Sequence, residues 1–217
     1  MRVGMTWLSL ALLMIALFGG CNRSKPAEEI GLGSLDGKTY SHQHFNFQIT
    51  FPDDWYIMGE AEQKELMEAG KRFATSGNKQ LEAAAQAAES QTLTLVSAFQ
   101  HPPGTPVPSN SNIIIMAERV AHAPGIKSGA DYLAHMQNTL RQTGMQPQFQ
   151  PVERNQPVGS LTMDVLPMEM NVMLQTVRQR HHATRIKDYV LVIAVSHAGE
   201  EDLRELTEIL NTIRPAK

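Results

Sequence analysis

Residues 44–55 read His-Phe-Asn-Phe-Gln-Ile-Thr-Phe-Pro-Asp-Asp-Trp. Apolar side chains occupy every second position of the first eight, which are Phe45, Phe47, Ile49 and Phe51. Polar side chains occupy the positions between them, which are His44, Asn46, Gln48 and Thr50. Because successive side chains of a strand point to opposite faces, this alternation predicts a half-buried strand whose polar face is in water. The Pro-Asp-Asp that follows predicts a turn.

The rest of the chain after residue 55 divides into helical and strand-like segments. Apolar spacing predicts a pair of helices over about residues 60–89, interrupted at Ser76-Gly77-Asn78. A capping box formed by Ser128 and Asp131 predicts a helix that runs to about residue 144. Acidic residues 200–202 open a last helix that runs to about residue 213. Strands are expected at residues 91–100, 112–120, 148–153, 160–168, 172–182 and 189–196.

The order of these segments indicates the fold class. Strands mostly follow one another, and helices come at interruptions and at the end, so the strict alternation of a parallel sheet is missing. Ile113-Ile114-Ile115-Met116 is apolar on both faces, which is typical of a central strand covered on both sides. We therefore predict an α+β fold, a mainly antiparallel sheet with helices packed on it, formed by one domain over residues 38–217.

The Phe51-Pro52-x-x-Trp55 segment and the C-terminal strand and helix, residues 189–213, also carry a family resemblance. Together with the order of elements over about residues 38–215, they resemble the Mog1/PsbP-like α+β sandwich found in many small bacterial lipoproteins. The two helices near residues 60–89 resemble an insertion seen in some of them. The resemblance implies a binding, accessory or assembly role and no enzyme activity. It transfers no ligand and no catalytic residue, because a fold does not fix a function.

The first twenty residues have the three parts of a secretory signal peptide. Arg2 supplies a positive start, and a mostly apolar run of 14 residues extends from Met5 to Phe18. As a helix this run would span about 21 Å, which is short of the roughly 30 Å hydrocarbon core of a bilayer. Gly19-Gly20 then provides the small residues of a cleavage site. Residues 1–20 are therefore predicted to be a cleaved signal.

Residues 17–21, Leu-Phe-Gly-Gly-Cys, resemble a bacterial lipobox, in which the cysteine sulfur receives a lipid. Cys21 is the only cysteine in the chain, and an unpaired thiol in an exported protein needs a purpose that lipidation provides. We predict that Cys21 is the lipidation site and holds the protein on a membrane. Residues 21–37 are polar and interrupted by Gly and Pro, which predicts a flexible linker.

Charge and motifs exclude several classes of function. Removing residues 1–20 removes one charge, Arg2, and leaves 18 basic and 22 acidic residues, a net charge of −4. This balance gives no basic surface for nucleic acid, which we do not expect as a partner. The sequence has no G-x-S-x-G, H-E-x-x-H or phosphate-binding loop motif. We predict no enzyme activity, no catalytic residue and no cofactor.

Histidines are the remaining candidates for chemistry. On a strand, His42 and His44 would share the polar face, whereas the neighbours His181 and His182 would point to opposite faces. A zinc site needs three or four converging ligands, so we interpret these histidines as solvent-facing and predict no metal site. The leading hypothesis is a lipid-anchored, non-catalytic binding or assembly protein of the bacterial cell envelope, with an envelope protein as partner. A periplasmic solute or metal binder that uses these histidines, or a hydrolase with an unrecognised site, are the alternatives.

Overall fold

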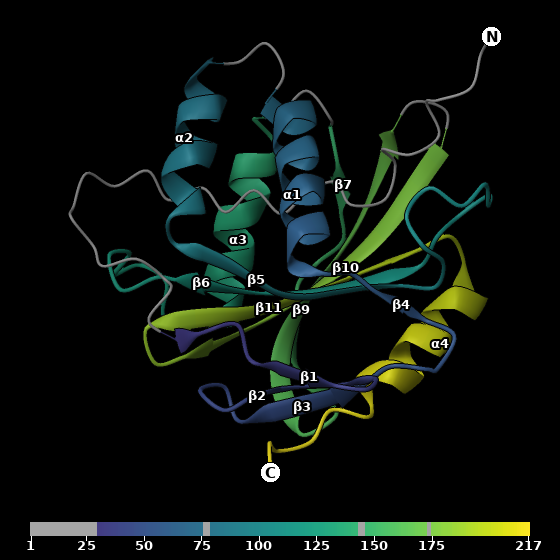
Figure 1. The fold of residues 1–217 in the computed structure, drawn as a ribbon. Coiled ribbons are helices and arrows are strands. Elements are labelled where there is room, and N and C mark those ends of the chain that lie inside the picture. The colour runs from purple at the N-terminus through teal and green to yellow at the C-terminus, as the bar shows by residue number, and fades with distance from the viewer. Residues whose placement is uncertain (1–29, 76–78, 143–145, 173–174) are drawn as a thin grey trace, which may run out of the picture.

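The computed structural model describes residues 30–75, 79–142, 146–172 and 175–217. The predicted signal peptide, Cys21 and the first part of the linker lie outside these residues. The described chain forms a large sheet and a small sheet with four helices, α1 to α4, packed against them (Figure 1).

The large sheet is antiparallel at every pairing of its strands. Its order is β4-β5-β6-β11-β10-β9-β7, and β8 pairs with β9 beside this path. Its strands are β4 (Tyr56–Ile57), β5 (Thr92–Phe99), β6 (Asn112–Arg119), β7 (Gln148–Phe149), β8 (Glu153–Val158), β9 (Leu161–Val172), β10 (Gln175–Ile186) and β11 (Tyr189–His197). The predicted fold class, a mainly antiparallel α+β architecture, is confirmed.

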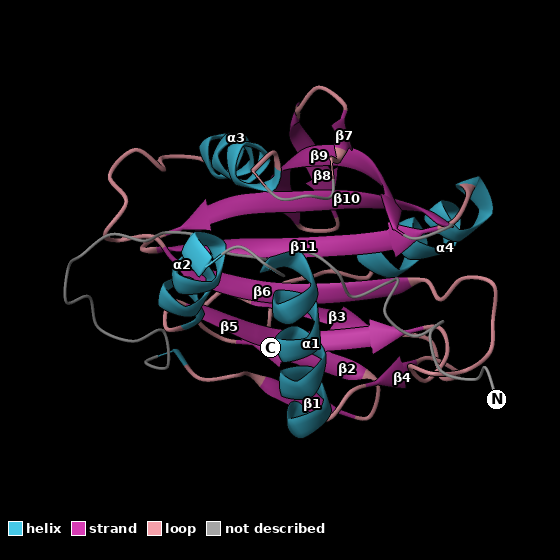
Figure 2. Ribbon diagram, turned by 90° about the horizontal axis from the view of Figure 1, so that it is seen from above, coloured by secondary structure: helices cyan, strands magenta, loops and turns pink. Residues whose placement is uncertain are grey.

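The four helices divide between the two faces of this sheet. Helices α1 (Glu60–Thr75), α2 (Lys79–Glu89) and α3 (Gly129–Leu140) cover one face, and α4 (Glu200–Leu210) and the small sheet cover the other (Figures 1 and 2). The predicted cap of α3 is confirmed, since the Asp131 amide donates to Ser128 Oγ at 3.2 Å and Ser128 Oγ donates to Asp131 Oδ2 at 2.9 Å. Helices α3 and α4 both end earlier than predicted.

The small sheet has the order β1-β2-β3, with β1 (Ser34–Asp36), β2 (Thr39–His42) and β3 (Phe47–Thr50). The composition predicts a flexible linker up to residue 37, but residues 34–36 form β1, so this boundary is wrong. Strand β1 pairs antiparallel with β2, and the Tyr40 hydroxyl donates to the Leu32 carbonyl at 2.6 Å. The ordered body therefore begins before residue 38, because backbone pairing with β2 compensates for the polar sequence.

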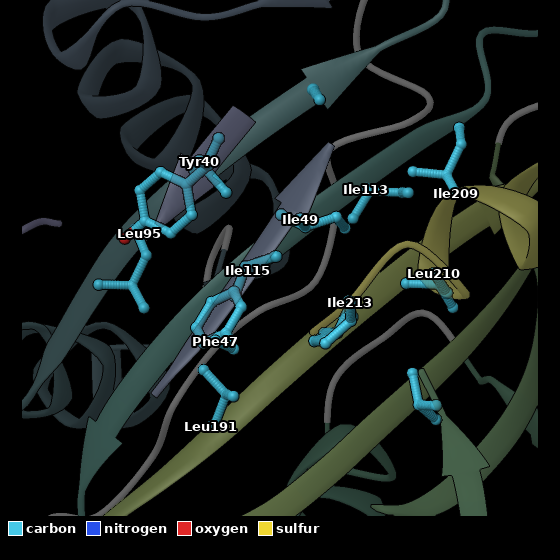
Figure 3. Packing of buried hydrophobic residues seen from close by; sticks show 14 of the residues in the cluster. Tyr40, Phe47, Ile49, Leu95, Ile113, Ile115, Leu191, Ile209, Leu210 and Ile213 are labelled. Carbon is cyan, nitrogen blue, oxygen red and sulfur yellow. The ribbon is translucent and has the colours of Figure 1, made fainter. Parts of the chain in front are cut away.

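The main hydrophobic core lies between the two sheets and α4. Apolar residues of β2 and β3 face those of β5, β6 and β11, and the C-terminal residues close one side (Figure 3). The members that Figure 3 labels are Tyr40, Phe47, Ile49, Leu95, Ile113, Ile115, Leu191, Ile209, Leu210 and Ile213. The predicted apolar stripe is confirmed, because Phe45, Phe47, Ile49 and Phe51 are all buried.

The predicted water-facing side of this strand is wrong at two residues. Residues 43–46 form a turn, with Asn46 at φ 50°, so the strand begins only at Phe47. His42 precedes the turn and pairs directly with Phe47, which places it on the core face with 1% of its surface exposed. Gln48 does lie on the other face, but backbone hydrogen bonds to Arg214 of 2.8 and 3.1 Å bring the C-terminal segment over it, and it is 5% exposed.

Candidate functional site

A pocket of about 300 Å³ lies between α4 and the strands β8, β9 and β10. This volume is at the small end of the range for ligand sites in proteins. Its walls combine aliphatic and polar side chains, which are those of Gln156, Pro157, Val158, Val165, Arg180, His182, Leu203, Thr207, Leu210 and Asn211. Half of these ten side chains are polar, so the pocket suits a ligand that makes hydrogen bonds as well as apolar contacts.

The periodicity of β10 and α4 explains why these residues meet. Alternate residues of β10 share one face of the sheet, so Arg180 and His182 both point toward α4. Leu203 and Thr207 of α4 and Asn211, which caps its C-terminal end, follow at intervals of four, which places them on one stripe. That stripe lies beside the buried stripe of α4 that contributes to the main core.

The turn between β8 and β9 fixes one end of the pocket against the end of α4. Gly159 has φ 56°, and a Cβ placed there would lie 2.4 Å from the Ile213 carbonyl oxygen. The Ser160 amide donates to that same carbonyl at 2.9 Å. Only glycine fits this contact, because a side chain would clash with the backbone of the C-terminal segment.

His182 is a neutral hydrogen-bond acceptor at the pocket wall. Its Nδ1 lies 3.1 Å from the Ile193 carbonyl oxygen, which can only accept, so the proton is on Nδ1 and the lone pair is on Nε2. Burial lowers the pKa of His182 to about 4, against a smaller opposite effect of the hydrogen bond to Ile193. The ring is therefore neutral at pH 7 and offers Nε2 as an acceptor.

Arg180 provides the positive charge of the pocket. Its Nη2 donates to Glu153 Oε2 at 2.6 Å, and both side chains keep part of their surface in solvent. Strand β8 carries an irregularity between Glu153 and Gln156, where its register against β9 shifts. A guanidinium has five N–H donors, so the pair with Glu153 does not exhaust the capacity of Arg180 to bind an anion.

The other histidines of the metal hypothesis lie elsewhere. The rings of His42 and His44 are 6.5 Å apart, and His42 Nε2 lies 3.3 Å from the Gly31 carbonyl oxygen. His181 points to the opposite face from His182, as predicted, and its Nε2 lies 3.2 Å from Gln179 Oε1. Within the described ranges, no group of three or more His, Cys, Asp or Glu side chains is placed to hold a metal ion.

The interpretation of these histidines as solvent-facing is wrong for three of the four. His42, His181 and His182 are buried, and burial lowers the pKa of each, to about 3 for His181. For His181 and His182, the reason is that helices or the small sheet cover both faces of the sheet that carries β10. Of the four, His182 alone lines the pocket beside α4.

Sequence patterns alone do not identify Arg180 or the α4 stripe as site residues. The alternation of Arg178, Arg180 and His182 on one face of a strand was the available signal. It did not identify a site by itself, because charged residues on one face of a strand commonly face water. The predicted lipidation site, Cys21, lies outside the described residues. None of the helices in the described ranges is both long and apolar enough to cross a membrane.

No protein-family model matches the chain, and no curated protein matches it in sequence. Several solved structures are similar to it. Cyanobacterial PsbP (CyanoP) from Synechocystis sp. PCC 6803 is 12% identical, with a TM-score of 0.49 over 85% of this chain and 99% of the other. LpqN of Mycobacterium tuberculosis, described as involved in cell envelope biogenesis, is 14% identical, with a TM-score of 0.39 over 78% of this chain and 83% of the other.

A protein from Bacteroides thetaiotaomicron VPI-5482 is 10% identical, with a TM-score of 0.45 over 84% of this chain. The chain spans 50% of the length of that protein. A PsbP protein is among the solved structures to which this chain is similar. These likenesses concern the fold and carry no ligand or activity over to this chain.

Proposed function

We propose that this protein is an exported, lipid-anchored binding or accessory protein of the bacterial cell envelope, and that the pocket beside α4 is its ligand site. The observation that carries the binding role is this pocket of about 300 Å³, which Arg180 and the neutral His182 line together with aliphatic and other polar side chains. The anchor rests on the sequence, where the only cysteine, Cys21, ends a signal-like segment.

The chemistry of the pocket supports binding over catalysis. A general base works best with a pKa near the operating pH, whereas the pKa of His182 is about 4. Its Nδ1 donates to the Ile193 carbonyl, so no carboxylate orients the ring as in a hydrolytic triad. The Thr207 hydroxyl donates to the Leu203 carbonyl of its own helix at 2.7 Å, which occupies its proton. These contacts weigh against the hydrolase alternative.

The membrane anchor is tested by replacing its proposed attachment atom. Cys21→Ser is expected to abolish incorporation of a clickable fatty acid into the protein in growing cells, because the sulfur that would carry the lipid is gone. The variant should also leave the membrane fraction while its body keeps the circular dichroism spectrum of the wild type. The matched control, Asn22→Ser, changes the neighbouring residue and should keep the label. Equal labelling of Cys21→Ser and the wild type would contradict the anchor.

The binding role is tested by placing a photoreactive amino acid at the pocket mouth of the lipidated protein in living cells. Asn211 is an exposed pocket residue, so crosslinks from position 211 should capture an envelope molecule. The control position is the exposed Gln142, which follows α3 on the opposite side of the sheet. The measurement is mass spectrometry of the purified crosslinked products. A product pattern that is the same for both positions would contradict a ligand site beside α4.

A further inference from the structure

The side chains that line the pocket beside α4 indicate which chemical class of ligand it binds. We infer that this pocket binds the free C-terminal residue of a peptide with an apolar side chain, that is, an N-acylated apolar α-amino acid with a free carboxylate. The inference rests on the proposed function and names the ligand of the same site. Each part of such a residue has a counterpart in the pocket.

The carboxylate would bind Arg180. The guanidinium already holds the Glu153 carboxylate at 2.6 Å, so its position beside the pocket suits a carboxylate oxygen. Its planar arrangement of donors matches a carboxylate better than a single ammonium group would. Glu153 competes for the same donors, and its charge repels a second carboxylate. The competition predicts the direction of a change in affinity: removal of the Glu153 charge must strengthen binding of the ligand carboxylate.

The peptide N–H would donate to His182. Since Nδ1 holds the proton and faces Ile193, Nε2 is the ring atom that would accept from the ligand, and it requires a donor. A simple fatty acid has a carboxylate and an apolar chain but no such donor. His182 and Arg180 are two residues apart on one face of β10, so their Cα atoms lie roughly 7 Å apart. The long arginine side chain allows both to reach groups on one ligand Cα.

The remaining walls of the pocket would contact the apolar side chain of the ligand and its preceding peptide group. Val158, Val165 and Leu210 are buried side chains that present aliphatic surface to the pocket. The volume of about 300 Å³ suits one side chain with its backbone and not a long acyl chain. Gln156 and Asn211 add carboxamides, which can both donate to and accept from a peptide bond. This pair favours a peptide over a 2-hydroxy acid.

The test uses the full lipidated chain in nanodiscs and isothermal titration with a hexapeptide that ends in leucine. Its matched ligand is the same peptide with a C-terminal amide, which lacks the charge and should bind at least about 10-fold more weakly. N-acetyl-leucine is the third ligand, and binding of either free acid supports the inference. If it binds as tightly as the hexapeptide, the recognised unit is the acylated amino acid alone. Equal affinities for the acid and the amide would overturn the inference.

Variants on β8 and β10 separate recognition from folding. Arg180→Gln should weaken binding of the free acid by about 10- to 100-fold. The control Arg178→Gln removes an arginine of the same face of β10 that pairs with Glu169 at 3.0 Å and does not line the pocket, so affinity should stay unchanged. Glu153→Gln should strengthen binding, a gain that loss of structure cannot produce.

The outcomes also distinguish this inference from the proposed function. Unchanged or weaker binding by Glu153→Gln, or equal affinities of the acid and the amide, would show that Arg180 does not recognise a carboxylate. If no free acid binds while crosslinking from position 211 still captures an envelope molecule, the ligand class is wrong and the binding role stands. If crosslinking also fails, both are wrong.

Discussion

Replacement of Phe47 with alanine is expected to lower the free energy of unfolding by about 3–5 kcal/mol. Phe47 is completely buried in the main core, and its ring lies 5.9 Å from that of Tyr40 (Figure 3). It comes from the small sheet and packs between that sheet and the large one, so its loss leaves a cavity at the contact between the two layers. Domains of this size are stable by about 5–15 kcal/mol, so the loss is a large part of the total.

Urea denaturation of the body, residues 30–217, followed by tryptophan fluorescence, measures this loss. The control is Leu35→Ala in β1, because Leu35 is 51% exposed and its truncation should cost less than about 0.5 kcal/mol. Losses of similar size for the two variants would mean that the small sheet does not form the core contact described above. The midpoint should shift for Phe47→Ala while the dependence on urea concentration stays the same.

Local patterns predicted most of the elements because their causes lie within a few residues. The alternation of Phe45, Phe47, Ile49 and Phe51 specified a buried face, and the doubly apolar run at residues 113–116 is the middle of β6, next to β11 in the large sheet. The cap of α3 depends on Ser128 and Asp131 alone, which are three residues apart. Such signals act within one strand or one helical turn, so a single sequence contains them.

Contacts between distant segments account for what the sequence did not predict. His42 lies on the core face because a turn, and not a continuous strand, separates it from Phe47, and the two then pair directly. Gln48 is buried by Arg214, which is more than 160 residues away in the chain. The pocket likewise combines residues of β8, β9, β10 and α4. No periodic pattern in the sequence shows that a distant segment will cover Gln48, or that residues of four elements will line one pocket.

Three buried ionisable groups give the folding stability a predictable pH dependence. Burial raises the pKa of Glu118 to about 8, and a hydrogen bond of 2.8 Å from the Tyr132 hydroxyl offsets this only partly. Burial lowers the pKa of His181 to about 3 and that of His182 to about 4. Folding therefore keeps a carboxyl group protonated and two imidazoles neutral under conditions in which the unfolded chain would ionise them.

The signs of these effects are opposite. Below pH 6.5 both histidines are protonated in the unfolded chain and remain neutral in the folded protein. The free energy of unfolding therefore increases with pH up to about 6.5. Burial also lowers the pKa values of His42, His44, His122 and His197, which act in the same direction. For Glu118, the folded protein keeps a proton that the unfolded chain releases above about pH 4.5, so stability decreases as pH rises toward 8.

The sum of the two effects predicts maximum stability near pH 6.5. Between pH 6.5 and 8.5 Glu118 alone lowers the stability by about 2 kcal/mol, and the remaining gain from His181 and His182 reduces the net loss to about 1 kcal/mol. Glu118→Gln should remove that loss, because glutamine keeps an acceptor for the Tyr132 hydroxyl and has no proton to release. The variant should keep the decrease in stability below pH 6.5, which belongs to the histidines. Urea titrations of both proteins at half-unit steps from pH 5 to pH 9 measure this. A wild-type curve that is flat above pH 6.5, or an equal decrease in Glu118→Gln, would show that Glu118 is already ionised in the folded protein.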